Sequence, residues 1–409
     1  MQATSSPDSF EIPSGAPAAA RTCLKLLGRL NQGSLTVQLP DGSVQHFGQS
    51  GGQAEIHGSL IMHNWSVCSA ALRSGDIGFA ESYIAGEWST PHLADLLRVF
   101  VANRREVEDV IYGTWLGRLA YRIKHLLNRN TKTNSQKNIH AHYDLGNAFY
   151  ELWLDKSMSY SSAWFDGDTS QPMIDAQHAK VRRALEMANV QAYDRVLEIG
   201  CGWGGLVEIA AKEFDANITG VTLSVEQLEF ARKRMDRVGK ASHADLRLQD
   251  YRDIQDQPFD AICSIEMVEA VGREYWPQYF ETVSRLLKSG GHACIQAITI
   301  EDALFDRYVK STDFIQQYIF PGGCLPSPSE FRKAALAAGL EVVDQFAFGK
   351  DYAETCRRWR ADFLHRRAEI LPLGFDEKFM RTWEFYLAYC EAAFEEQNID
   401  VMQFTLRKP

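Results

Sequence analysis

The pattern of apolar and polar residues from about residue 190 onward predicts strands alternating with helices. The expected strands are the short apolar runs RVLEIG (195–200), NITGVTL (217–223), FDAICSIE (259–266), HACIQAITI (292–300) and EVVDQFAF (341–348). Segments between them, such as GGLVEIAAKEF (204–214) and SVEQLEFARKRM (224–235), have helical periodicity. This alternation predicts an α/β fold with a mostly parallel sheet covered by helices on both faces.

The preceding part of the chain has a different pattern. SLTVQLPDGSVQHFG (34–48) alternates apolar and polar residues around Pro40-Asp41-Gly42, which predicts a β-hairpin. HLADLLRVFVANRREVEDVI (92–111) has helical periodicity. We therefore expect a disordered tail at 1–20, a small α+β domain at 21–110, a basic amphipathic linker helix at 111–140 and a larger domain at 141–409.

Composition excludes several classes of protein. The chain has 409 residues and a net charge of −10, which does not favour binding to nucleic acid. It lacks both an apolar run of roughly 18 residues and the features of a signal peptide. The eight cysteines form no CxxC pair, so we expect neither a metal site nor a disulfide framework, and a cytoplasmic location.

Positive charge is concentrated in one segment. No acidic residue occurs between Ile111 and Tyr143, and Leu116, Leu119 and Ile123 share one predicted helical face with basic residues around it. Such a helix binds an anionic membrane surface peripherally. A linker helix that packs the two domains together is the alternative interpretation, and both roles can coexist.

A glycine-rich turn provides the strongest chemical signal. Val196–Gly205 (VLEIGCGWGG) joins an apolar strand to a helix, and Gly200 and Gly202 allow the backbone to approach a ligand closely. The spacing GxGxG, with Glu198 before it, fits a methyltransferase better than the GxGxxG motif of dinucleotide-binding proteins. A purely structural turn is the remaining alternative.

Two further positions fit a nucleoside ligand. Asp250 and Tyr251 offer an acid and an aromatic ring for an adenine group. Thr222 and Gln227 stand where a carboxylate commonly binds ribose hydroxyls, so neutral hydrogen bonds must replace it there.

Several motifs resemble the cyclopropane fatty acid synthase and mycolic acid cyclopropane synthase family, over about residues 75–409. They occur in the family's order: GDIGFAESYIAGEW (75–88), HYDLGNAFYELWLD (142–155), MSYSSAWF (158–165), VLEIGCGWGG (196–205), GVTLSVEQ (220–227), IEMVEAVG (265–272) and YIFPGGCLPS (318–327). The resemblance implies a class I, Rossmann-like methyltransferase fold, S-adenosylmethionine as co-substrate, unsaturated acyl chains of membrane phospholipids as acceptors, and a homodimer. It also implies that the domain at 21–110 is lipid-associated and that the domain at 141–409 is catalytic.

The resemblance also implies which residues form the site. Family contacts to S-adenosylmethionine correspond to Tyr160, Ser161, Gly200, Gly202, Thr222, Leu223, Gln227 and Tyr251. Family ligands for a catalytic bicarbonate correspond to Ser162, Glu269, Gln296, Ile298 and Tyr352.

This sequence departs from the cyclopropane-forming pattern near the bicarbonate. Ser162 replaces the usual cysteine, Gln296 replaces a histidine, and Ala270 follows Glu269 where a histidine is common. A neutral glutamine offsets repulsion between Glu269 and an anion less well than a protonatable histidine. We therefore expect bicarbonate binding to be weakened or lost.

Methyl transfer to an alkene leaves a carbocation, which the protein must shield from water until a base removes a proton. Aromatic rings stabilise cations by roughly 0.5–2 kcal/mol each, and the candidates are Tyr160, Trp164, Tyr318 and Phe320. Glu269 acts as the base directly or holds bicarbonate together with Gln296 and Tyr352. The alternatives are ordinary pocket lining for the rings, a helix-terminal acid for Glu269 and a core hydroxyl for Tyr352.

The expected reaction is transfer of a methylene group to a cis double bond, giving a cyclopropane. If the base faces a neighbouring chain carbon, the product is a methyl-branched alkene instead. The sequence is also compatible with a methyltransferase for a small soluble acceptor and with a lipid-binding protein without activity.

The role of the basic segment can be tested by charge reversal. Each basic residue near an anionic surface contributes about 1 kcal/mol. Replacing both Arg118 and Arg122 with Glu should therefore lower the affinity for phosphatidylglycerol vesicles, measured by co-sedimentation, by about tenfold or more. Unchanged vesicle binding and unchanged activity on vesicles would show that the segment does not dock on membranes.

Overall fold

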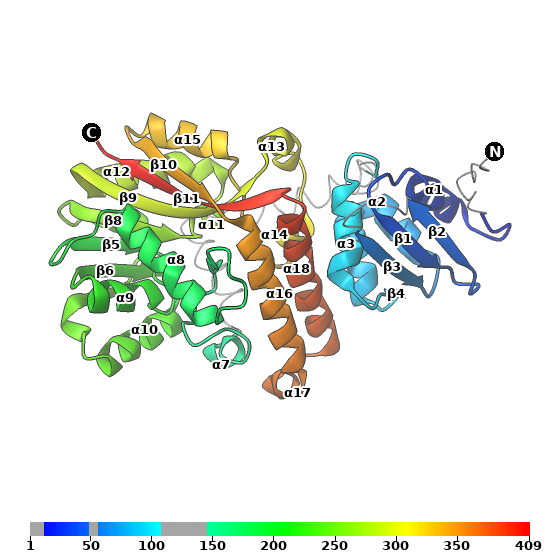
Figure 1. Ribbon diagram of the computed structural model, residues 1–409, viewed down its shortest axis with the longest axis horizontal. Coiled ribbons are helices and arrows are strands. Elements are labelled where there is room, and N and C mark those ends of the chain that lie inside the picture. The colour runs from blue at the N-terminus through cyan, green and yellow to red at the C-terminus, as the bar shows by residue number, and fades with distance from the viewer. Residues whose placement is uncertain (1–11, 49–55, 108–144) are drawn as a thin grey trace.

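The computed structural model describes residues 12–48, 56–107 and 145–409, which form two units (Figure 1). The N-terminal unit comprises residues up to 107, and the larger unit begins at 145. The segment predicted as a basic helix, 111–140, lies outside the described residues.

The larger unit is built on a seven-stranded sheet of order β10-β11-β9-β8-β5-β6-β7. The strands from β5 to β9 pair in parallel, whereas β11 is antiparallel to both β9 and β10. Their bounds are β5 Arg195–Ile199, β6 Asn217–Thr222, β7 Ala244–Leu248, β8 Phe259–Ile265, β9 Leu287–Ile300, β10 Glu341–Ala347 and β11 Ile399–Arg407. All five predicted strands are confirmed, and β7 and β11 were not predicted.

Helices cover both faces of this sheet, as predicted. On one face, α12 and α15 pack against residues such as Leu197 and Ile295, and on the other, α8, α9 and α10 pack against residues such as Val196 and Cys263. Adjacent residues of β5 thus enter opposite cores, as strand geometry requires. The covering helices are α8 Met173–Met187, α9 Gly205–Glu213, α10 Val225–Arg237, α12 Trp276–Leu286 and α15 Pro328–Ala337.

Two long helices, α16 and α18, stand beside the sheet and face the N-terminal unit (Figure 1). They pack against each other, and buried aromatic residues such as Trp359 and Trp383 lie in their shared core. Their bounds, with those of the remaining helices, are α16 Gly349–His365, α18 Glu377–Glu395, α7 Asn147–Tyr150, α11 Val268–Val271, α13 Asp302–Tyr308, α14 Phe314–Tyr318 and α17 Arg367–Ile370.

The N-terminal unit has a four-stranded sheet of order β2-β1-β3-β4 and three helices among its described residues. The predicted hairpin is confirmed: β1 and β2 pair antiparallel, and Ser43 donates from its N–H and its hydroxyl to Asp41 in the turn, at 2.9 and 2.6 Å. The bounds are β1 Ser34–Gln38, β2 Val44–Gly48, β3 His57–Met62, β4 Trp88–Ser89, α1 Ala18–Leu27, α2 Ser66–Ile84 and α3 Leu93–Ala102.

The tail predicted for residues 1–20 extends too far. Helix α1 begins at Ala18, and Ala16 and Ala20 are buried in the core of the N-terminal unit. The small side chains that suggested a tail instead allow α1 to pack closely.

The two units share one apolar core and are joined by polar contacts to α18. The Tyr83 hydroxyl donates to Glu384 at 2.8 Å, and the Arg98 guanidinium donates to Glu396 at 2.9 Å. Helix α3 lies alongside α18 (Figure 1). The N-terminal unit is therefore held against the side of the larger unit that α18 forms.

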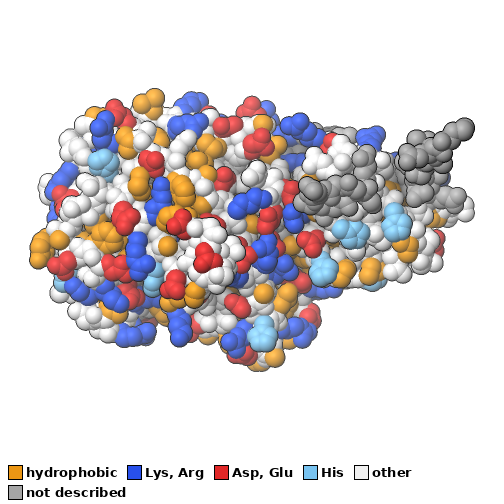
Figure 2. Space-filling view, viewed as in Figure 1, with side chains coloured by type: hydrophobic (Ala, Val, Ile, Leu, Met, Phe, Trp, Pro, Cys, Tyr) orange, Lys and Arg blue, Asp and Glu red, His pale blue; other side chains and the backbone are white. Residues whose placement is uncertain are grey.

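Within the described ranges, no helix is both long and apolar enough to cross a membrane. On the face shown in Figure 2, acidic and basic side chains are interspersed over the larger unit.

Candidate active site

A cavity of about 180 Å³ lies at the carboxyl ends of β5, β6 and β8, where ligands bind in open α/β sheets. Every residue predicted to contact the co-substrate lines this cavity: Tyr160, Ser161, Gly200, Gly202, Thr222, Leu223, Gln227, Asp250 and Tyr251. Tertiary structure thus brings together side chains from four separate segments.

The glycine-rich turn adopts the backbone conformation that its sequence requires. Gly200, Gly202 and Gly204 have φ values of 85°, 49° and 81°, in the region that glycine tolerates best. A Cβ on Gly200 would lie 2.7 Å from Cγ of Met267. Backbone strain therefore disfavours larger residues at all three glycines, and lack of space adds to it at Gly200 and at Gly204, where a Cβ would lie 2.9 Å from Cβ of Ala231.

Two pairs of hydrogen-bonded polar side chains also line this cavity. The Thr222 hydroxyl donates to Oε1 of Gln227 at 2.9 Å, which orients that amide. The Asp250 carboxylate accepts hydrogen bonds from the Arg252 guanidinium, at 2.8 Å from Nε. The neutral pair predicted to replace a ribose-binding carboxylate is thus preformed.

Two buried charged residues, Glu198 and Lys180, also line the cavity. Burial raises the pKa of Glu198 to about 8, an effect that the nearby Lys180 opposes. Burial lowers the pKa of Lys180 to about 8, and its ammonium donates to Oγ of Ser161 at 2.6 Å. Oε2 of Glu198 has no hydrogen-bond partner among the described residues, so it can accept one from a ligand.

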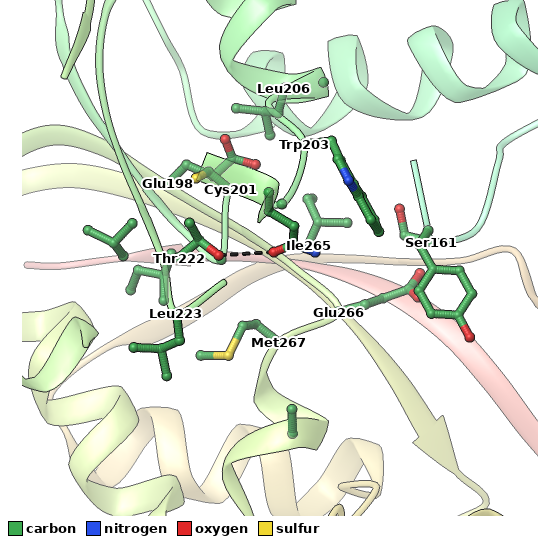
Figure 3. A pocket seen from close by; sticks show the side chains of 18 of the residues that line it. Ser161, Glu198, Cys201, Trp203, Leu206, Thr222, Leu223, Ile265, Glu266 and Met267 are labelled. Carbon is green, nitrogen blue, oxygen red and sulfur yellow. Dashed lines mark hydrogen bonds between the residues drawn. The ribbon is translucent and has the colours of Figure 1, made fainter. Parts of the chain in front are cut away.

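A second cavity of about 230 Å³ adjoins the first on the side of α16 and α18. Three residues line both cavities: Tyr160, Glu266 and Ala270. Figure 3 shows Glu266 and Ser161 on one side of the first cavity, away from Thr222 and Leu223. A group transferred between the two cavities must therefore pass beside the Glu266 carboxylate.

Glu266 is the site residue that the sequence did not single out. Its carboxylate accepts three hydrogen bonds: from the Ser162 N–H at 2.9 Å, from Nε2 of Gln296 at 2.7 Å and from the Tyr352 hydroxyl at 2.6 Å. These donors belong to three of the residues predicted to bind bicarbonate. An acidic residue at the end of a buried strand is the signal by which it could have been found.

The donors to Glu266 are themselves held in place. Gln403 on β11 donates from Nε2 to Oε1 of Gln296 at 3.1 Å, which turns the Gln296 amide nitrogen toward Glu266. Arg183 in turn donates to Oε1 of Gln403 at 2.6 Å. Ser162 contributes only its backbone, because its hydroxyl donates to the Ala163 carbonyl.

Glu266 also has an uncommon backbone conformation, with φ of 52°. Such conformations cost of order 1–3 kcal/mol and persist where surrounding contacts hold them, often at active sites. Burial raises the pKa of Glu266 above its ordinary value, while Lys180, Tyr352, Ser162 and Gln296 oppose that rise.

Glu269 and Ile298, the other two predicted catalytic positions, meet in the second cavity. The Ile298 N–H donates to Oε1 of Glu269, and Oε2 has no hydrogen-bond partner among the described residues. Burial raises the pKa of Glu269 to about 8, and the Glu266 carboxylate adds to that effect. Protonation of Glu269 reduces the repulsion between these two buried carboxyl groups.

The aromatic residues predicted to shield a cation divide into two groups. Tyr160 and Phe320 line the second cavity. Trp164 instead packs against Phe346, and Tyr318 is 41% exposed and donates to Glu81. The prediction for Trp164 and Tyr318 is therefore wrong, because packing turns both rings away from the cavity.

Tyr386 was missed and completes this lining. It is buried on α18, and its hydroxyl shares a hydrogen bond of 2.8 Å with that of Tyr160. Because α18 lies more than two hundred residues from Tyr160, no local pattern could reveal this pair.

Comparisons with known proteins agree with this geometry. Residues 130–404 match the family described as mycolic acid cyclopropane synthetase. A tuberculostearic acid methyltransferase of Mycobacterium tuberculosis is 38% identical over 407 residues, covering 97% of this chain and 93% of that protein. A cyclopropane-fatty-acyl-phospholipid synthase of Escherichia coli is 35% identical over 335 residues, covering 81% of this chain and 83% of that protein.

The fold is shared with solved structures as well. The crystal structure of the mycolic acid cyclopropane synthase CmaA1, complexed with SAH and CTAB, has a TM-score of 0.63 and 31% identity to this chain. The matched region covers 67% of this chain and 98% of the CmaA1 chain. The predicted class I methyltransferase fold is thereby confirmed.

The raised pKa of Glu269 predicts how stability depends on pH. The unfolded state releases this proton near the ordinary pKa of 4.5, whereas the folded state retains it up to about 8. Folding is therefore favoured less as pH rises between these values, by up to roughly 1.4 kcal/mol per pH unit for one proton. Glu269→Gln removes this loss, so the free energy of unfolding of the variant relative to wild type should increase from pH 5 to pH 8.

Urea unfolding at several pH values measures this difference. A difference between the two proteins that stays constant with pH would contradict the raised pKa.

Proposed function

Because this chain belongs to the mycolic acid cyclopropane synthetase family of S-adenosylmethionine-dependent methyltransferases, we propose that it methylates the cis double bond of unsaturated acyl chains in membrane phospholipids. We further propose that the product is a methyl-branched alkene rather than a cyclopropane. The observation that carries this proposal is the Glu266 carboxylate, which takes the three donors expected to hold bicarbonate.

The first cavity fits S-adenosylmethionine. The unpartnered Oε2 of Glu198 matches a cationic amino group, and the space beside Gly202, where a Cβ would meet nothing within 4 Å, leaves room for the ligand. The ring of Tyr251 lines the same cavity and suits stacking or edge contact with adenine. When bound, S-adenosylmethionine supplies an electrophilic methyl group on a sulfonium centre.

The second cavity fits a long hydrocarbon. Ile77, Ile298, Ile315 and Phe320 are among its apolar lining residues. Names of two similar proteins point the same way, since one is a tuberculostearic acid methyltransferase and the other a cyclopropane-fatty-acyl-phospholipid synthase. An alkene lying beside Tyr160, where the cavities meet, faces the co-substrate site.

Most of the catalytic contribution of this chain is alignment and exclusion of water. An alkene is a weak nucleophile, so the chain must hold it in line with the methyl carbon. Methyl transfer forms a bond between the methyl carbon and one alkene carbon while the sulfur–methyl bond of S-adenosylmethionine breaks. It releases the neutral thioether S-adenosylhomocysteine and leaves a cation on the other alkene carbon. The rings of Tyr160, Phe320 and Tyr386 surround this position and each stabilises a cation by roughly 0.5–2 kcal/mol.

Glu266 then accepts a proton from a chain carbon next to the cation, and the electrons of that C–H bond form a new double bond. Its three donors hold the carboxylate at the junction of the cavities. Bicarbonate has no role in this reaction, because its expected donors are engaged and Glu266 would repel an added anion. Glu269, whose pKa is raised to about 8, is a poorer candidate for the base at neutral pH.

Three other functions fit the chain less well. Cyclopropane formation needs the base to face the transferred methyl group, whereas in the proposed reaction Glu266 faces a carbon of the chain. A small soluble acceptor does not need the apolar second cavity, and a lipid-binding protein without activity does not need a buried carboxylate where the cavities meet.

Isotopic labelling distinguishes the two products. With vesicles of unsaturated phospholipid and trideuteromethyl S-adenosylmethionine, a methyl-branched alkene formed in this way retains all three deuterium atoms. A cyclopropane retains only two, because the transferred carbon itself loses one. We expect mass spectrometry to show full retention and proton NMR to show a vinyl signal, and a cyclopropane as the sole product would contradict the branching proposal.

Substitution of Glu266 tests the proposed base. Glu266→Gln should lower the rate of methyl transfer by about 10²-fold or more, while calorimetry should show S-adenosylmethionine binding within about threefold of wild type. Glu266→Gly frees the donors of Ser162, Gln296 and Tyr352, so added bicarbonate should restore part of the rate. Glu229→Gln, on the exposed side of α10, is the matched control, and full activity of Glu266→Gln would exclude Glu266 as the base.

A further inference from the structure

A third cavity, of about 140 Å³, lies within the N-terminal unit against α18. Its wall is formed by apolar side chains from α1, α2, β3 and α3, including Leu26, Leu60, Val67, Ala71, Leu97 and Phe100. A cavity of roughly 150 Å³ with such a lining stays dry and can bind a molecule the size of benzene. The cavity therefore offers space for about six hydrocarbon carbons.

This cavity adjoins the second one. Four residues line both: Asp76, Val101, Arg104 and Tyr389. Because the second cavity also meets the co-substrate cavity at Tyr160 and Glu266, the three cavities form one series. The series begins at the glycine-rich turn and ends inside the N-terminal unit.

Charge in the third cavity is confined to its junction with the second. Asp76 and Arg104 are its only charged lining residues within the described ranges, and both belong to the shared set. Asp76 accepts hydrogen bonds from the Tyr389 hydroxyl at 2.9 Å and from the Phe314 N–H at 3.1 Å. Arg104 donates to Asn398 at 3.4 Å. Both charged groups at the junction of the two cavities therefore have polar partners.

The far end of the third cavity suits the end of a hydrocarbon and excludes a headgroup. An ester or a phosphate placed there would lose its hydrogen bonds to water without replacement, which is costly. A methyl-terminated chain instead gains free energy with each CH₂ group that it buries there.

We propose that the N-terminal unit binds the methyl-terminal segment of the acyl chain whose double bond is methylated in the larger unit. This inference rests on the proposed function and adds a binding subsite to it. The N-terminal unit then determines how far the chain enters, and thereby which carbons lie beside Tyr160 and Glu266.

Photo-crosslinking tests the location of the chain end directly. The probe is a phosphatidylglycerol whose cis-unsaturated chain carries a diazirine at its methyl end, presented in vesicles to the full-length wild-type protein. We expect peptide mapping to show labelling of α1 and α2. Labelling confined to the larger unit would overturn the proposal. A second probe carries the diazirine on its saturated chain instead. If this second probe labelled α1 and α2 and the first did not, the proposal would also be overturned.

Filling the cavity tests its effect on selectivity. Ala71 lines only the third cavity, and Ala71→Phe places a ring in it. Two phosphatidylglycerols are compared, with the double bond at the same distance from the ester but with a short or a long methyl-terminal segment. We expect the ratio of methylation rates, long over short, to fall by about tenfold or more.

Ser69→Phe, which adds the same ring on the exposed side of α2, should keep the wild-type ratio. An unchanged ratio in Ala71→Phe would overturn the proposal.

The two experiments separate this proposal from the proposed function. Crosslinking needs no turnover, so labelling of α1 and α2 without any methyl transfer would support the subsite and refute the activity. Methyl transfer with crosslinks confined to the larger unit would support the activity and refute the subsite.

Discussion

Burial of the Glu266 carboxylate is the constraint around which the proposed reaction centre, at the junction of the first and second cavities, is arranged. A buried carboxylate needs donors or a counter-charge, because transfer from water without them costs several kcal/mol. Its three donors come from the segment after α7, from β9 and from α16. The three hydrogen bonds to this one carboxylate therefore fix three separate parts of the fold relative to β8.

The same carboxylate explains the state of its neighbours. Glu269 lies close enough for the Glu266 carboxylate to add to the burial that raises the pKa of Glu269 to about 8. Lys180 favours the ionised form of Glu266 while donating to Ser161. The Glu266 carboxyl group thereby lies where the first and second cavities meet.

Helix α18 links this centre to the N-terminal unit. Tyr386 on α18 contacts Tyr160 at the reaction centre, and Tyr389, one turn further along, contacts Asp76 of the N-terminal unit. Both tyrosines line the second cavity. The helix therefore lines the second cavity from Tyr160 to its junction with the third cavity.

The sequence by itself determined the strands β5, β6, β8, β9 and β10 and the glycine-rich turn. It did so because strand periodicity and glycine conformation are local properties. The nine residues predicted for the co-substrate all line one cavity, because most of them follow strand ends in a common topology. The short strand β7 and the C-terminal strand β11 escaped prediction, because their patterns do not indicate which strands they pair with.

Only the tertiary structure decided the partners of Glu266, the outward position of Trp164 and Tyr318, and the contribution of Tyr386. Most of these features depend on side chains that meet across a hundred residues of chain or more. Periodicity reveals that a face is buried, but the packing of whole elements decides what that face contacts. The cavity of the N-terminal unit arises in the same way, since its wall is completed by α18 from the opposite end of the chain.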